Sequence, residues 1–171
     1  MSMSSAAIPT FEITLGALSK LLDKAEAFCS AKKTDSGALL GTRLAPDMFA
    51  LTKQIQVACD QAKNGSARLA GIDPPKFEDN EKTIPELKER IAKTLAFVKT
   101  VDRKAIDASA DRAIVFPLGP KKGEMKGADY LNHFVLPNFY FHSAMAYGLL
   151  RHAGLEIGKQ DFLAGIPLKI T

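Results

Sequence analysis

The sequence has only two cysteines, Cys29 and Cys59, in 171 residues, and it contains no CxxC pair. So few cysteines exclude a disulfide-built scaffold, and the missing pair excludes a cysteine-based zinc site of the usual spacing. Both cysteines fall on apolar stripes of predicted helices. We therefore expect two buried, free thiols in a reducing, cytoplasmic setting.

The chain also has little excess charge of either sign, since it contains 23 Lys and Arg and 19 Asp and Glu, for a net charge of +4. The basic residues are scattered, without aromatic residues between them, so no nucleic-acid partner is expected. The first ten residues, MSMSSAAIPT, have neither a basic start nor a long apolar run. We expect residues 1–9 to form a loose tail, not a signal peptide.

One segment, residues 130–150, has no charged side chain and is long enough to span a bilayer. It nevertheless carries Asn132, His133, Pro137 and His142, which are costly in lipid. This polar load predicts a buried helix of a soluble protein, with no membrane partner. The length and the ordinary composition, 46% hydrophobic and 25% charged, predict a single domain over residues 1–171.

Apolar residues spaced three or four apart predict an all-α protein with four helices. A loop rich in small residues is expected at 34–45, and a β-hairpin is expected from residues 113–116 and 124–126. The tail 158–171 is expected to pack across the bundle. The predicted helices are Thr10–Lys33, Pro46–Ala70, Thr83–Asp107 and Asp129–Ala153.

Local signals mark several helix ends. Thr83 and Glu86 have the spacing of a capping box, and Gly154 is placed to end the last helix. Pro137 cannot donate to the carbonyl four residues back, which predicts a kink or a break there. The Asn64-Gly65 pair is expected to loosen the preceding helix.

Two polar residues lie one turn apart on the apolar stripe of the last helix, Asn138 and His142. A buried polar side chain is costly unless it is hydrogen-bonded or ligated. These two residues either satisfy each other and a neighbour or face a cavity. The stripe also contains Leu131, Met145 and Leu149.

Known catalytic templates are absent: the sequence has no GxGxxG, GxxxxGK, GxSxG or HExxH. The metal-binding pair HxxxH is missing too, because Asn138 stands at its first position. The second helix has no histidine but offers Cys59, with Gln56 at the edge of its stripe. A metal held by His142 and a Cys59–His142 nucleophile pair therefore stay open as alternatives.

Tyr140, Tyr147 and Arg151 share the opposite face of the last helix, a composition typical of interface hot spots. They predict either a homodimer contact or an exposed face without a role. His152, near the end of the helix, suits the negative end of the helix dipole and is interpreted as structural.

The run NFYFHSAMAYGLLRHAGLEIGKQDFL at 138–163 resembles the signature of a family of unknown function in the DinB/YfiT-like metalloenzyme superfamily. LAPDMFALTKQIQVACDQAK (44–63), ARLAGIDPP (67–75) and TIPEL (83–87) match in the same order. The resemblance implies a four-helix bundle, often dimeric. It also implies a divalent metal held by one His of the second helix and an HxxxH pair of the fourth. His142 matches the second His of that pair.

We expect a small-molecule-binding bundle, with metal-independent acid–base chemistry of isomerase, dehydratase or cyclase type in accessory or secondary metabolism. His142 would be the acid–base group, Asn138 would orient it or hold a substrate oxygen, and His133 would lie at the pocket mouth. No cofactor is expected. One alternative is a metal-dependent, thiol-dependent transferase with zinc, nickel or iron, and another is a non-catalytic, partner-binding bundle. The residues expected to line the internal pocket are Met145, Phe141, Leu149, Gln56, Cys59 and Ile55.

Overall fold

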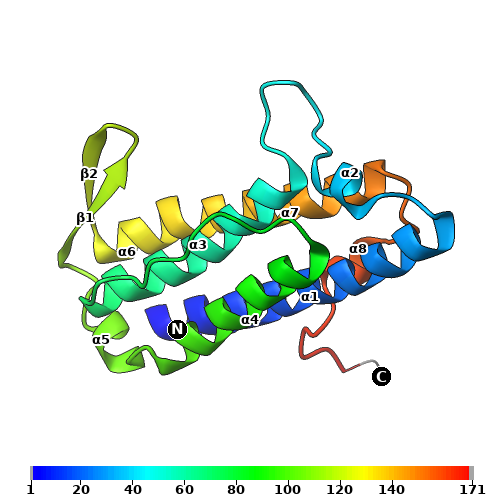
Figure 1. Ribbon diagram of the computed structural model, residues 1–171. Helices are drawn as coiled ribbons and strands as arrows, with labels where there is room; N and C mark the ends of the chain where they lie inside the picture. The colour runs from blue at the N-terminus through cyan, green and yellow to red at the C-terminus, as the bar shows by residue number, and fades with distance from the viewer. Residues whose placement is uncertain (1, 170–171) are drawn as a thin grey trace.

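The computed structural model describes residues 2–169 and is mostly helical (Figure 1). Its long helices run side by side, with α3 against both α4 and α7, and α1 against α4 and α7. Their apolar faces meet in one buried core, in which the rings of Phe11 and Phe139 pack edge to face at 4.9 Å. The long helices are α1 (Met3–Lys32), α3 (Leu51–Ala70), α4 (Ile84–Thr100) and α7 (Leu136–His152).

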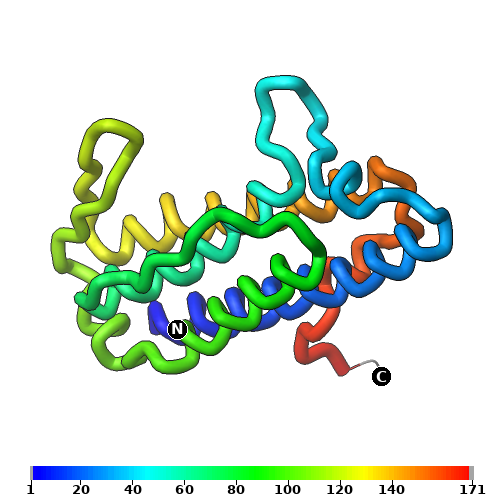
Figure 2. The backbone as a smooth tube through the Cα atoms, in the orientation of Figure 1, coloured from blue at the N-terminus to red at the C-terminus, as the bar shows by residue number. Residues whose placement is uncertain are grey.

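The predicted hairpin is confirmed as β1 (Ala113–Leu118) paired antiparallel with β2 (Lys121–Lys126). Phe116 fastens it to the helices, because its ring lies 4.8 Å from that of Tyr130 and 4.5 Å from that of Phe134. The hairpin and the loop formed by residues 41–50 project from the same side of the helical body (Figure 2).

The expected loose N-terminal tail is wrong, because α1 begins at Met3 and runs through Pro9. Ser2 caps the helix by accepting a bond from the amide of Ser5. The amide and hydroxyl of Ser4 both donate to Asp107, at 2.7 and 3.0 Å. These bonds hold the first turn against a distant part of the chain and explain why the helix starts so early.

The second predicted helix starts five residues later than expected. Residues 36–40 form the short helix α2 (Ser36–Leu40), whereas Pro46 lies in the projecting loop 41–50. The amide of Leu51 donates to the carbonyl of Thr42 at 3.0 Å, which closes the base of this loop. As a result, α3 starts at Leu51 and not at Pro46.

The capping box of α4 is confirmed: the amide of Glu86 donates to Thr83 Oγ1, and the amide of Thr83 donates to the Glu86 carboxylate. The helix ends at Thr100, before the predicted Asp107. Asp102 then caps a separate short helix, α5 (Arg103–Asp107), by accepting from the amide of Lys104. This second cap competes with continuation of α4 and explains the earlier end.

The predicted last helix is three consecutive segments. α6 (Gly127–Asp129) leads into a π-helical segment, Tyr130–Val135, and α7 follows with Pro137 in its first turn. Proline is tolerated there because first-turn amides have no intrahelical partner. The break expected at Pro137 is therefore a change of helix type just before it. Gly154, with φ of 99°, ends the helix as predicted.

The chain after α7 folds back onto α1 and α7 through α8 (Lys159–Phe162), although residues 170–171 of the predicted tail lie outside the described part. Phe162 packs on Tyr147 at 5.8 Å between ring centroids, and Arg151 donates to the carbonyl of Leu155. The tail thus covers part of the face predicted to form a homodimer contact. None of the helices within residues 2–169 is long and apolar enough to cross a membrane.

Candidate functional site

His142 on α7 meets Gln54 on α3, and the imidazole Nδ1 lies 2.7 Å from Oε1 of Gln54. The amide nitrogen of Gln54 donates to the backbone carbonyl of Phe49 at 3.2 Å. Gln54 is 2% exposed and His142 is 9% exposed. Burial disfavours the charged imidazolium, so the pKa of His142 lies below its ordinary value and the ring is neutral near pH 7.

Two aromatic rings flank this imidazole. Phe49 lies nearly parallel to it, at 6.2 Å and 24°, and Phe141 lies perpendicular to it, at 5.1 Å and 90°. Both phenylalanines are about half exposed, at 51% and 55%. Phe49, Gln54, Phe141 and His142 together form what we call the His142 site, which lies at the surface of the helical body rather than inside it.

Asn138 does not contact His142 through a hydrogen bond. Its side-chain nitrogen donates to the carbonyl of Phe134 at 2.7 Å, in the π-helical segment that precedes α7. Gln54 contacts His142 instead, although the sequence pattern did not single out this residue. A signal was present, because Gln54 is a polar residue on the apolar stripe of its helix, beside Leu51 and Ala58.

His133 also lies apart from His142. It is exposed on the π-helical segment, and its Nε2 is 3.9 Å from a carboxylate oxygen of Asp129. The structure therefore does not bring His133, which was expected at the pocket mouth, into contact with His142.

The residues expected to line an internal pocket with His142 occupy different surroundings. Ile55, Cys59 and Leu149 are fully buried in the core. Gln56 points elsewhere and donates to Glu81 at 2.8 Å. Of this set, Phe141 contacts the imidazole, and the half-buried Met145 follows one turn later on α7.

The thiol of Cys59 is unsuited to nucleophilic chemistry. Burial in the apolar core raises its pKa to about 12. A thiol with so high a pKa stays protonated near neutral pH, whereas the thiolate is the reactive form. The structure thus disfavours the Cys59–His142 nucleophile pair.

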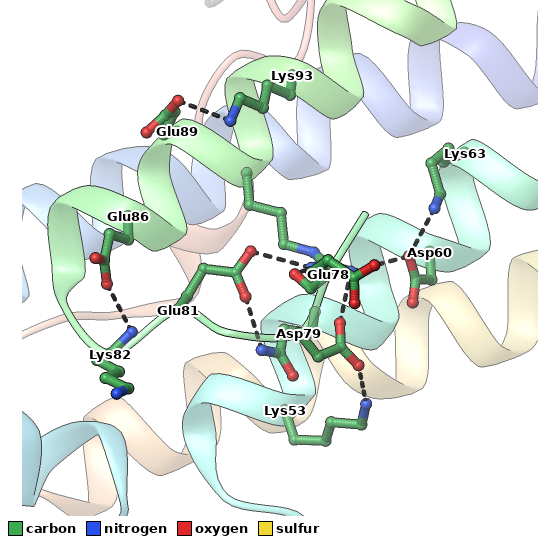
Figure 3. A network of polar contacts seen from close by, with 12 residues as sticks. Lys53, Asp60, Lys63, Glu78, Asp79, Glu81, Lys82, Glu86, Glu89 and Lys93 are labelled. Carbon is green, nitrogen blue, oxygen red and sulfur yellow. Dashed lines mark hydrogen bonds and ion pairs between the residues drawn. The ribbon is translucent and has the colours of Figure 1, made fainter. Parts of the chain in front are cut away.

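A second polar cluster surrounds Arg90, whose side chain is 1% exposed on α4. The guanidinium contacts Asp60 of α3 at 3.0 Å, and Asp79 and Glu81 at 2.9 and 3.0 Å. It also donates to the carbonyl of Glu78. Residues 71–83, which we call the connector, are thereby tied to α4 through the carboxylates of Asp79 and Glu81 (Figure 3).

Lys63 adds a second buried cation to this cluster. It pairs with Asp60 at 3.2 Å, donates to the carbonyl of Pro75 at 2.8 Å, and lies 4.4 Å above the ring of Phe77. Lys53 pairs with Asp79. The cations Lys53, Lys63 and Arg90 balance the carboxylates Asp60, Asp79 and Glu81.

A groove of about 400 Å³ runs beside this cluster and is lined by Phe77, Glu81, Glu89 and Arg90 among others. Its carboxylates already have partners, since Glu81 contacts Arg90 and Glu89 pairs with Lys93 at 2.7 Å. We interpret the cluster as a clamp that holds the connector, not as a ligand site.

The donors at the His142 site do not fit the three-histidine metal centre that the resemblance implies. At the two positions where the resemblance implies further histidines, Gln54 and Asn138 supply amides, which are poor ligands for zinc, nickel or iron. Nδ1 of His142 is committed to Gln54. Across residues 2–169, no group of three or more His, Cys, Asp or Glu side chains has a suitable arrangement.

Both the sequence and the fold of the chain are similar to known proteins. A family model described as "Domain of unknown function (DUF1993)" matches residues 3–163. The fold is similar to the crystal structure of a DinB family member from Shewanella denitrificans, with a TM-score of 0.91 and 39% sequence identity. That match covers 98% of this chain and 95% of the other. No curated protein shows significant similarity to the chain.

Proposed function

The chain belongs to the DUF1993 family of domains of unknown function, and we propose that it is a cytoplasmic, small-molecule-binding protein of DinB-like four-helix-bundle type. The proposal rests on a neutral, hydrogen-bonded His142 set between two half-exposed phenylalanine rings. Such a group serves as a polar anchor and as a metal-independent acid or base near neutral pH. The two free, buried cysteines are consistent with a reducing compartment.

The surroundings of His142 indicate the kind of molecule that would bind. Phe49 and Phe141 offer apolar ring surface on two sides of the imidazole, whereas the ring nitrogen that does not face Gln54 is a polar contact. Flat or aliphatic apolar molecules with one hydroxyl, carboxyl or carbonyl group match this combination. Proton transfer at such a group is the chemistry shared by isomerases, dehydratases and cyclases.

Binding can be tested by NMR titration of the native protein with phenol, benzoate and cyclohexanol as probes. We expect at least one probe to shift the His142 ring resonances in a saturable way and to leave those of exposed His133 unchanged. Phe141→Ala should weaken that response by removing one wall of the site. Equal shifts at both histidines, or no shift at His142 across a broad panel of small alcohols and acids, would contradict the proposal.

Partner binding by a second copy of the chain is the second candidate. Large apolar side chains are about half exposed on the loop 41–50, on α7 and on the hairpin, namely Leu44, Phe49, Phe141, Val115 and Leu118. Exposed apolar side chains that gather on one face are typical of interaction sites. Light scattering of the native protein should then give the mass of a dimer, and Phe141→Ser should shift it toward one chain. Leu168→Ser, on the exposed tail, is the matched control.

A further inference from the structure

The direction of the hydrogen bonds around Gln54 fixes where the proton of His142 lies. The carbonyl oxygen of Phe49 only accepts hydrogen bonds, so the Gln54 atom 3.2 Å from it is the amide nitrogen. The other end of the same amide, Oε1, therefore faces the imidazole at 2.7 Å. Because that oxygen also only accepts, Nδ1 of His142 must carry the proton.

A neutral imidazole has a single N–H, so placing it on Nδ1 leaves a lone pair on Nε2. We propose that Gln54 is a positioning residue that locks His142 in the Nδ1–H tautomer and presents Nε2 as the basic atom of the site. In this arrangement a hydrogen bond from α3 orients the imidazole, and no metal ion is required. Its consequence for chemistry rests on the proposed function, but the tautomer itself does not.

Gln54 stands on the helix from which the family resemblance implies a metal ligand. The family resemblance implies a histidine ligand from the second long helix, and Gln54 is the side chain of that helix, α3, that reaches His142. Gln54 is almost fully buried and both ends of its amide are occupied, so it has no freedom to turn toward a metal. At the other expected ligand position stands Asn138, an amide whose nitrogen donates to the carbonyl of Phe134.

The tautomer can be read directly from long-range ¹H–¹⁵N correlation spectra of the histidine rings at a pH where His142 is neutral. We expect a protonated Nδ1 and an unprotonated Nε2 in the native protein. Gln54→Leu removes the acceptor and should move the population toward the Nε2–H form. Gln54→Glu keeps an acceptor oxygen and should restore the Nδ1 proton.

Gln56→Leu is the matched control, because it makes the same chemical change on the same helix at a side chain that contacts Glu81. It should leave the His142 tautomer unchanged. Nε2–H as the main form in the native protein would overturn the inference, and so would a Gln54→Leu spectrum identical to the native one. If one variant fails to fold, the native spectrum alone still decides the tautomer.

Metal content provides an independent readout. The native protein and His142→Ala, purified without added metal, are compared by elemental analysis for zinc, nickel and iron. We expect no stoichiometric difference between them. Near-stoichiometric metal in the native protein that disappears in His142→Ala would overturn the metal-free arrangement. A failed titration with small alcohols and acids would instead count against the proposed function and leave the tautomer result standing.

Discussion

Gly65 of α3 lies directly against Val135, the last residue of the π-helical segment, and a β-carbon at position 65 would be 2.6 Å from Cγ1 of Val135. The glycine thus allows the side chain of Val135 to pack closely on the backbone of α3 just before α7 begins. The Asn64-Gly65 pair was expected to loosen its helix, yet α3 continues through it to Ala70. In the structure, this glycine does not weaken the helix but makes room for Val135.

Gly65→Ala should therefore destabilise the protein, although alanine favours a helix. Overpacking of a tight core contact costs roughly 1–3 kcal/mol of unfolding free energy. Gly148→Ala on α7 is the control, because a β-carbon there meets nothing within 4 Å. That change should be neutral or stabilising by up to about 1 kcal/mol. Urea denaturation measures both, and equal effects at the two positions would disprove the close-approach explanation.

Removing the buried cation of the clamp should have a larger effect. Arg90→Ala leaves Glu81 without its cation and Asp79 with Lys53 alone, and it should cost roughly 3–5 kcal/mol, as is typical for breaking a buried ion pair. Lys93→Ala breaks an exposed pair one turn later and should change stability too little to resolve. Amide hydrogen exchange should show faster exchange within residues 71–83 in the first variant. Unchanged exchange there would show that the connector is held by other contacts.

Several carboxylates should make the fold sensitive to acid. The pKa of Glu86 is lowered by the backbone amide of Lys82, that of Asp107 by the amide of Ser4, and that of Asp161 by Lys24. A carboxyl whose folded pKa is depressed stabilises the fold above its unfolded pKa. That contribution is lost as the pH falls through the lower folded value.

With ordinary values of 3.8 for Asp and 4.5 for Glu, the loss should begin below about pH 4.5 and continue toward lower pH. Thermal melts followed by circular dichroism between pH 7 and pH 2.5 measure it. Asp107→Asn should flatten part of the slope, because its charged form would no longer matter. Stability that stays constant from pH 5 to pH 2.5 would contradict the prediction.

Local signals predicted the elements that depend on neighbouring residues. The box of Thr83 and Glu86 and the stop at Gly154 need only a few consecutive positions, and both are found where expected. The start of α1 was missed because Ser4 is held by Asp107, 103 residues away. The spacing of residues within one helix cannot predict a hydrogen bond to a residue so far along the chain.

At the His142 site too, the local feature was predicted from the sequence and the distant contact was not. His142 was selected because a histidine on an apolar stripe needs a partner, and this reasoning depends on one helix alone. The sequence offered Asn138, one turn away, as one possible partner, whereas the residue that contacts the ring, Gln54, is 88 residues distant. Choosing between Gln54 and Gln56 requires the rotation of α3 about its axis. That rotation is set by packing against α7 and α4, not by the spacing of residues along α3.

The titration of His142 gives the last prediction. Burial lowers the pKa of this imidazole below the ordinary 6.5, so an NMR titration should give a midpoint under that value. A base whose folded pKa is depressed stabilises the fold above the unfolded pKa, and this contribution is lost as the pH falls through the folded value. Gln54→Glu should raise the pKa of His142, because a carboxylate at Nδ1 favours the cation. Gln56→Glu, which faces Glu81 instead, should leave it unchanged, and equal shifts in the two variants would show that Gln54 has no specific contact with the ring.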